Sequence, residues 1–198
     1  MKISIILYHD FETLDVFGPV EVFGKVEGFF INFYSLKGGL VANRDNLQIQ
    51  TLNLSEAYGN TDVLFIPGGC GARQEVNNQE FIDCIQELGS KAKYVLTVCT
   101  GSAILAKTNL LDNKSATSNK RAFSFPVSVN PKVKWVKRAR WVEDGNVFTS
   151  SGISAGTDMT LAFVAKLKGL ETAKEAASVM EYIWNSNPDC DEFSSYAD

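Results

Sequence analysis

The chain has 198 residues, of which 45% are hydrophobic and 21% charged, a composition typical of one folded domain with a sizeable core. Its formal net charge is −4 at pH 7, so it lacks the basic surface that nucleic-acid binding needs. No apolar run reaches the roughly eighteen residues of a membrane span.

Four cysteines and one histidine bear on location and cofactors. The cysteines, at positions 70, 84, 99 and 190, lack the paired spacing of a metal site. Met1-Lys2 leads directly into the strand pattern of residues 3–7, with no secretion signal before it. We therefore expect a single cytoplasmic domain, residues 1–198, with free thiols, no metal and no cofactor.

The first half of the chain alternates strand and helix patterns. Residues 2–8 read as a central parallel strand. A helix follows with Pro19 in its first turn, where the missing N–H costs nothing. Asp15 then lies on the loop or helix entry beyond that strand. Further elements are predicted as strands at 30–36 and 62–66, short β pieces within 38–60, and a helix near 78–90.

The third quarter contains the pattern of a second strand–helix unit. A strand at 94–98 leads into a helix that ends near Thr108. Residues 116–125 read as a polar connection, with a short helix as the alternative. The basic run 132–140 alternates with apolar residues, as on the solvent face of a strand. Edge strands are predicted at 135–136 and 139–142, followed by a turn and a strand at 147–150.

The last quarter is predicted to be helical. Residues 159–167 form a nearly all-apolar helix, which we expect to be buried against the sheet or in a subunit interface. The final helix is predicted to begin with a capping box of Thr172 and Glu175 and to present apolar residues as far as Trp184. The acidic tail, residues 189–198, is expected to be exposed.

Strands that alternate with helices predict a three-layer α/β sandwich with a mainly parallel sheet. Ligands of such folds bind outside the carboxyl ends of the strands. The loops at these ends contain Asp15, Gly68-Gly69, Cys99 and Ser151-Gly152. We therefore expect these four loops to converge on one site.

Cys99 stands at the bend between the strand at 94–98 and the next helix. This strand–turn–helix pattern is the thiol counterpart of a nucleophile elbow. Amides and the dipole at a helix N-terminus lower the pKa of a cysteine from roughly 8.5 to about 3.5–7.5. A reactive Cys99 thiolate is thus one interpretation, and a buried structural cysteine is the other.

Asp15 is the preferred partner for Cys99. Like charges raise a pKa, so a carboxyl beside a thiolate is expected to hold its proton and to donate a hydrogen bond to the sulfur. The pair would supply a nucleophile and a general acid together. The alternative activator is His9, which lies at the same sheet edge. A helix-start role is the alternative for Asp15.

Backbone amides would stabilise developing negative charge. We assign this role to the amides of Gly69 and Thr100, with a tight turn as the alternative for Gly68-Gly69. The substrate pocket is expected to include a further set of residues: Gly68, Cys70, Ser118, Asn119 and Gly152. Within this set, Cys70 is interpreted as a bystander.

Several segments together resemble the ThiJ/PfpI superfamily, whose fold is similar to flavodoxin and to the class I glutamine amidotransferase domain. These segments are residues 14–23, 66–71, 98–102, 110–112, 116–118 and 149–152. Within the superfamily, Asp15 with Cys99-Thr100-Gly101 is similar to isonitrile hydratases, which use a cysteine and an aspartate in these places. The deglycase branch has a glutamate in the first motif. The resemblance also implies a homodimer.

One segment departs from the superfamily pattern. Asn119-Lys120-Arg121 stands where many relatives have His and Trp, which argues against histidine-assisted protease or amidase chemistry. The same domain occurs in AraC-type regulators, but this sequence ends at Asp198 without a helix-turn-helix pattern, so we expect no such use.

The resemblance implies a cofactor-free enzyme that acts on a small molecule. In this hypothesis, Cys99 attacks an isonitrile carbon, Asp15 protonates the intermediate to a thioimidate, and water releases an N-substituted formamide. The alternatives are a protease or amidase, a glyoxalase or deglycase, and a cysteine redox sensor without turnover.

Overall fold

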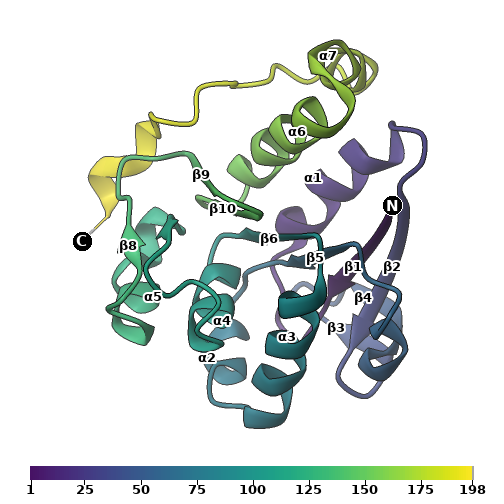
Figure 1. Ribbon diagram of the computed structural model, residues 1–198, viewed down its shortest axis with the longest axis vertical. Coiled ribbons are helices and arrows are strands. Elements are labelled where there is room, and N and C mark those ends of the chain that lie inside the picture. The colour runs from purple at the N-terminus through teal and green to yellow at the C-terminus, as the bar shows by residue number, and fades with distance from the viewer. Residues whose placement is uncertain (198) are drawn as a thin grey trace.

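A computed structural model describes residues 1–197 and shows a sheet between two helical layers (Figure 1). Eight strands form the sheet in the order β3-β4-β2-β1-β5-β6-β10-β9. Their bounds are β1 Lys2–Ile6, β2 Phe30–Ser35, β3 Gly39–Ala42, β4 Gln48–Asn53, β5 Val63–Ile66, β6 Tyr94–Val98, β9 Trp141–Asp144 and β10 Val147–Ser150. Only the edge pairs β3–β4 and β9–β10 of this sheet are antiparallel, so the predicted α/β class with a mainly parallel sheet is confirmed.

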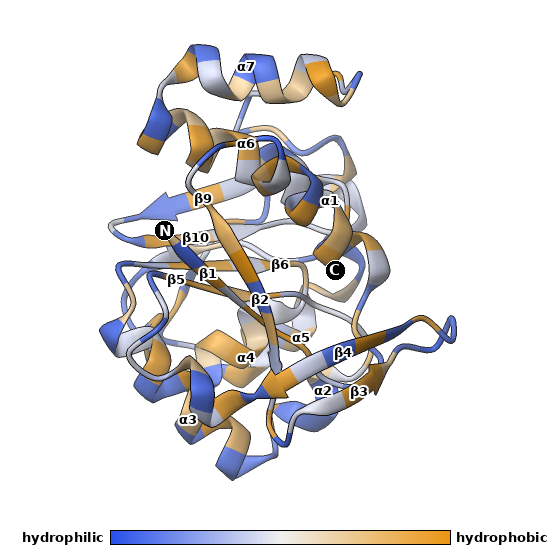
Figure 2. Cartoon of the chain, turned by 90° about the vertical axis from the view of Figure 1, so that its right-hand side faces the viewer, coloured by the Kyte–Doolittle hydropathy of each residue, from blue (hydrophilic) through white to orange (hydrophobic). Residues whose placement is uncertain are grey.

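The helices divide between the two faces of the sheet (Figure 2). One face carries α1 (Thr13–Gly24) and α6 (Ala155–Lys168), with α7 (Leu170–Val179) packed on α6. The other carries α2 (Ala72–Glu75), α3 (Gln79–Lys91), α4 (Gly101–Lys107) and α5 (Ser124–Val129). Smaller elements complete the described chain: η1 Leu54–Ala57, β7 Ser115–Ala116, η2 Lys120–Ala122, β8 Lys134–Trp135 and η3 Glu192–Tyr196.

Alternate residues of the central strands fill two apolar cores. Ile5 and Phe65 face the core beneath α1 and α6, whereas Ile6 and Leu64 face the core above α3 and α4. All four side chains are fully buried. Burial on both faces is the physical reason that these strands read as continuous apolar runs. The apolar helix predicted at 159–167 is confirmed as buried, because α6 lies between the sheet and α7.

The start of the first helix was predicted too late. Helix α1 begins at Thr13, immediately after the extended Glu12, so Pro19 lies inside it rather than in its first turn. The Glu12 amide donates to the Gly68 carbonyl at 2.8 Å, and this contact turns the chain into the helix. Pro19 has no N–H, so it leaves the carbonyl four residues earlier without its helical partner. Asp15 therefore lies in the first turn of α1.

The predicted edge strands differ from the observed ones. The strand expected at 139–142 forms later, as β9, and Trp135 pairs through β8 with β7 outside the main sheet. Arg140, placed on a solvent-facing strand, is buried because it pairs with Asp158. The polar connection at 116–125 contains η2 and runs into α5, in line with the helical alternative.

The C-terminal region also departs from its prediction. Helix α7 begins at Leu170, directly after Gly169, so Thr172 is not its cap; its hydroxyl donates to the Lys168 carbonyl. The helix ends at Val179, which leaves Ile183 exposed. The tail is not uniformly exposed: Asp191 is buried, and residue 198 lies outside the described residues. No helix within residues 1–197 is both long and apolar enough to cross a membrane.

Candidate active site

The elbow at Cys99 is a strained turn held from both sides. Cys99 has a φ of 57°, a left-handed conformation that L-residues adopt at a free-energy cost of order 1–3 kcal/mol. Its amide lies 3.2 Å from the carbonyl oxygens of Ser150 and Ser151. Its carbonyl accepts hydrogen bonds from the hydroxyls of Ser118, at 2.9 Å, and Ser102, at 3.0 Å. These contacts fix the sulfur at the carboxyl edge of the sheet.

The loop after β5 lies directly against the elbow. A Cβ atom at Gly68 would lie 2.6 Å from the Thr100 nitrogen and 2.8 Å from the Cys99 Cβ, so only glycine fits there. The Gly69 amide donates to the Thr100 hydroxyl at 3.0 Å. Of the two amides predicted as donors, the Gly69 amide therefore already has a partner. The Thr100 amide donates a hydrogen bond to the Cys99 sulfur and so lowers the pKa of the thiol.

Asp15 is a buried carboxyl beside the thiol. It has no exposed surface, and its Oδ2 accepts a hydrogen bond from the Gly68 amide at 2.8 Å. Burial raises its pKa to about 8, and the negative charge of Glu12 adds to this effect. Hydrogen bonds from the Gly68 amide, the Cys99 thiol and the Ile153 amide lower the pKa of Asp15. At neutral pH Asp15 therefore holds its proton, in line with the expected protonated acid.

The expected thiolate at Cys99 is not supported. Burial raises the pKa of the Cys99 thiol well above its usual value, and the Asp15 carboxyl raises it further. Hydrogen bonds from Thr100 and from Asn119 oppose these effects without reversing them. Helix α4 is only seven residues long, so its dipole is weak. The resting pair is thus a neutral thiol beside a neutral carboxyl, titrating as one coupled unit.

Asn119 contacts the sulfur directly. Its Nδ2 lies 3.1 Å from the Cys99 Sγ. Its Oδ1 accepts a hydrogen bond from the Ala122 amide at 3.2 Å and so caps η2. Because the oxygen is engaged by an N–H group, the amide nitrogen must be the group that faces the sulfur. A side chain at Gly152 would collide with this nitrogen and displace Asn119 from the sulfur.

A cavity of about 220 Å³ adjoins the elbow. Two of its lining residues contact Cys99 directly: Asn119 reaches the sulfur, and the Ser151 carbonyl reaches the amide. Gly152 also lines the cavity and packs against Asn119. The remaining lining residues are Lys120, Arg121, Ile153, Ser154, Phe193 and Tyr196. Two of them, Phe193 and Tyr196, come from the C-terminal segment.

The structure brings together most but not all of the residues predicted for the site. Cys99, Asp15, Gly68, Thr100, Ser118, Asn119 and Gly152 lie around the elbow. Cys70 does not line the cavity; it is exposed, with its sulfur 3.9 Å from Arg44. His9 is also exposed; its Nδ1 lies 3.3 Å from the Ala42 carbonyl, and it does not line this cavity. Among the described residues, no group of three or more His, Cys, Asp or Glu side chains is suited to a metal ion.

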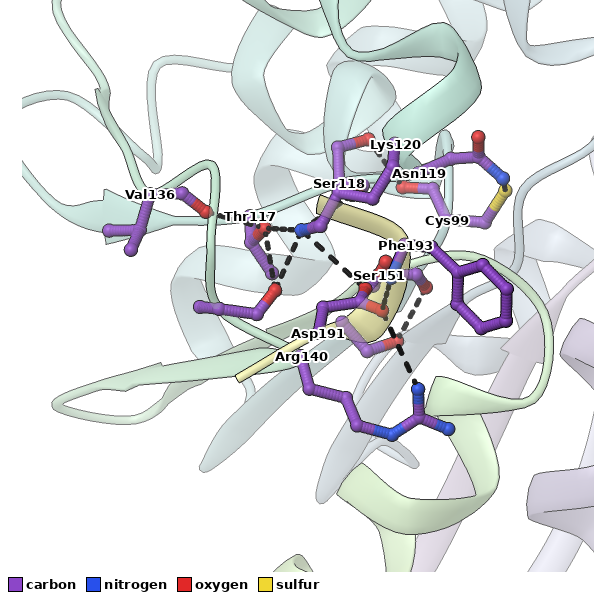
Figure 3. A network of polar contacts seen from close by, with 12 residues as sticks. Cys99, Thr117, Ser118, Asn119, Lys120, Val136, Arg140, Ser151, Asp191 and Phe193 are labelled. Atoms are coloured by element: carbon purple, nitrogen blue, oxygen red, sulfur yellow. Dashed lines mark hydrogen bonds and ion pairs between the residues drawn. The ribbon is translucent and has the colours of Figure 1, made fainter. Parts of the chain in front are cut away.

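A buried charge network joins the elbow region to the C-terminal segment (Figure 3). The Lys120 ammonium donates to the Thr117 hydroxyl at 2.8 Å and the Ala139 carbonyl at 2.6 Å. It lies 3.8 Å from the Asp191 carboxylate, which is also 3.8 Å from Arg140. Burial lowers the pKa of Lys120 to about 8. Sequence reasoning missed this network, and the only signal for it was the pair of basic residues at 120 and 121.

Comparisons with known proteins agree with the resemblance found in the sequence. The model of the DJ-1/PfpI family matches residues 1–166. An isonitrile hydratase from Pseudomonas putida is 30% identical over 182 residues, which are 92% of this chain and 78% of that protein. An HTH-type transcriptional regulator, GbdR from Pseudomonas aeruginosa, is 28% identical over 75% of this chain and 40% of its own length. A ThiJ/PfpI family protein from Pseudomonas syringae superposes with a TM-score of 0.81 at 30% identity, over 91% of this chain and 74% of that one.

Proposed function

The chain belongs to the DJ-1/PfpI family, and on that premise we propose that it is a cysteine-dependent isonitrile hydratase. The observation that carries the proposal is the pair of Asp15 and Cys99, a buried acid that holds its proton next to a buried thiol. Such a pair suits an addition that needs a nucleophile and a proton at the same carbon. The 30% identity to the Pseudomonas putida enzyme supports the choice of substrate.

The proposed first step joins the Cys99 sulfur to the terminal carbon of the isonitrile. The thiol passes its proton to one oxygen of Asp15 while the other oxygen gives its proton to the same carbon, which forms a thioimidate, R–N=CH–S–Cys99. The hydrogen bond between the Cys99 thiol and the Asp15 carboxyl supports a direct transfer of the proton. Asp15 ends the step neutral, so no charge is left in the buried site.

The second step consumes one water molecule. Its oxygen adds to the thioimidate carbon while its protons go to the substrate nitrogen and, through Asp15, back to the sulfur. The C–S bond then breaks and releases the N-substituted formamide, R–NH–CHO. In this proposal the Thr100 amide, which donates a hydrogen bond to the sulfur, stabilises it as that bond breaks. The atoms balance as isonitrile plus water to formamide, with Cys99 and Asp15 restored.

The test is conversion of cyclohexyl isonitrile by the purified protein, with formamide measured by chromatography. We expect turnover that declines above about pH 8, where Asp15 loses its proton. Cys99→Ser should lose roughly a thousandfold or more in rate, while Cys70→Ser and Cys190→Ser should keep the wild-type rate because both thiols are exposed and lie outside the cavity. Absence of conversion anywhere between about pH 5 and 9 would refute the substrate, and full activity of Cys99→Ala would refute the mechanism.

The alternative functions have less support. Histidine-assisted hydrolysis would need His9, which contacts the Ala42 carbonyl and is not among the groups that act on the pKa of Cys99. A redox sensor would need a thiol of low pKa, whereas burial raises the pKa of Cys99. A glyoxalase or deglycase activity would be detected with methylglyoxal. A homodimer is also part of the proposal, and light scattering would test it.

A further inference from the structure

Three partly exposed apolar side chains gather around the cavity beside Cys99. Phe193, Tyr196 and Ile153 all line it, and their exposed fractions are 54%, 55% and 38%. The rings of Phe193 and Tyr196 lie nearly parallel, with centroids 6.4 Å apart and an interplanar angle of 25°. Apolar groups that stay exposed around one cavity mark a surface where another molecule binds.

The segment that carries the two rings is anchored rather than loose. Asp191 is 1% exposed, and its amide donates to the Arg138 carbonyl at 2.8 Å. Its carboxylate caps η3 by accepting from the Phe193 amide at 3.1 Å, between the cations of Lys120 and Arg140. The rings therefore occupy defined positions as a wall of the cavity.

The cavity borders the reacting centre through the side chain of Asn119. Asn119 lines it on one side and contacts the Cys99 sulfur at 3.1 Å on the other. Its volume of about 220 Å³ exceeds the roughly 150 Å³ of a protein cavity that holds benzene. A substrate whose reactive carbon reaches Cys99 would place its substituent between Ile153 and the two rings.

The wall belongs to a part of the chain that the family model does not match. That model ends at residue 166, whereas the wall comes from residues 191–196. The Arg121 guanidinium lies 5.0 Å from the centre of the Tyr196 ring, a cation–π contact that supports the ring from one side. No acidic side chain is among the lining residues in the described part of the chain. The chemistry of the lining thus favours a flat apolar group.

We propose that residues 191–196 form the pocket for the substrate's N-substituent, and that this pocket selects isonitriles with an aromatic substituent. This inference rests on the proposed function for the identity of the reacting group. The pocket itself rests on the cavity, the rings and the buried anchor, independently of the reaction.

The experiment compares benzyl isonitrile with methyl isonitrile, whose substituent is too small to fill the cavity. Phe193→Ala and Tyr196→Ala should each lower kcat/KM for benzyl isonitrile by roughly tenfold while changing it little for methyl isonitrile. Phe30→Ala is the matched control, because Phe30 is a similarly exposed ring on β2 that does not line the cavity. It should leave both substrates unchanged.

Calorimetry with the product analogue N-benzylformamide separates the two proposals. If no isonitrile is consumed but N-benzylformamide binds the wild type and binds Phe193→Ala or Tyr196→Ala about tenfold more weakly, the pocket stands and the reaction is wrong. If both isonitriles are consumed and the two variants change them equally, the reaction stands and the pocket is wrong. Absence of N-benzylformamide binding to the wild type would also overturn the pocket.

Discussion

Asp15 and Asp158 are both completely buried, but their surroundings are opposite. Asp158 accepts hydrogen bonds from Arg140 Nε at 2.7 Å, from the Asn185 amide at 3.0 Å and from the Tyr182 hydroxyl at 3.1 Å. Asp15 accepts one from the Gly68 amide, and no cation contacts it within the described chain.

The difference in charge around the two carboxyls underlies the separate roles that we propose for them. Burial raises the pKa of both carboxyls, but at Asp158 the Arg140 guanidinium counters that rise with an opposite charge. At Asp15 the groups that oppose it are uncharged, namely the Gly68 amide, the Cys99 thiol and the Ile153 amide, so Asp15 keeps its proton up to about pH 8. A buried acid without a cation can transfer protons, whereas one paired with arginine holds segments together.

Among the changes that test this comparison, the replacement of Asp15 should have the largest effect, and that effect is on activity. Asp15→Asn keeps the size of the side chain and its acceptor for the Gly68 amide but removes the transferable proton. We expect kcat/KM for the isonitrile to fall about a thousandfold, with the fold retained. Steady-state kinetics and a urea unfolding curve measure the two properties. Activity within tenfold of wild type would show that Asp15 does not transfer the proton.

Asp158→Asn should have the complementary effect. It leaves the Arg140 guanidinium buried and short of its main partner, so the free energy of unfolding should fall by about 3 kcal/mol. The folded fraction should keep most of its activity toward methyl isonitrile, because Asp158 does not contact the elbow. Urea unfolding with activity per folded molecule checks both statements. An unchanged unfolding midpoint would mean that the ion pair contributes little.

The pH dependence of stability sharpens the comparison further. The pKa of Asp15 is raised from 3.8 to about 8 on folding, so the folded state binds the extra proton between these values. Stability from this group is complete below about pH 4 and is lost as the pH rises toward about 8, by at most about 1.4 kcal/mol per pH unit. Asp15→Asn should remove this pH dependence. The midpoint of urea unfolding of the variant should therefore rise relative to that of the wild type as the pH increases toward 8.

The smallest expected effect concerns the strain stored at the elbow. Cys99 adopts a φ of 57°, which glycine adopts without penalty but alanine does not. Cys99→Gly should therefore be more stable than Cys99→Ala by about 1 kcal/mol, although both are inactive. At Ala103, in the regular helix α4, the same exchange of alanine for glycine should instead destabilise by a similar amount. Equal stabilities of the two Cys99 variants would mean that the turn is unstrained.

The sequence allowed the sheet and the Asp15–Cys99 pair to be predicted, because loops after parallel strands meet at one edge. It did not allow the ionisation state of Cys99 to be predicted, since burial outweighs the amides of a seven-residue helix. The direct contact of Asn119 with the sulfur spans twenty residues and depends on the cap at Ala122. No local pattern encodes such a distance.

The environment of the C-terminal segment was also not predictable from its own sequence. Its acidic composition predicted an exposed tail, as is usual for solvated charges. Asp191 is buried instead, because Lys120 and Arg140 supply positive charge from distant parts of the chain. Composition describes a segment alone, whereas burial depends on what the rest of the fold presents to it.

The position of β5 between β1 and β6 has a consequence for the kinetics of folding. Asp15 follows β1 and Cys99 follows β6, so the acid and the thiol meet only after β5 has paired in parallel with both strands. Parallel pairing between distant segments is slow, because the entropy of closing long loops is lost before the contacts form. We expect a refolding chain to regain its helical signal early and to remain inactive. Recovery of the proposed isonitrile hydration should therefore coincide with the slowest folding phase, so that this activity reports the assembly of the sheet.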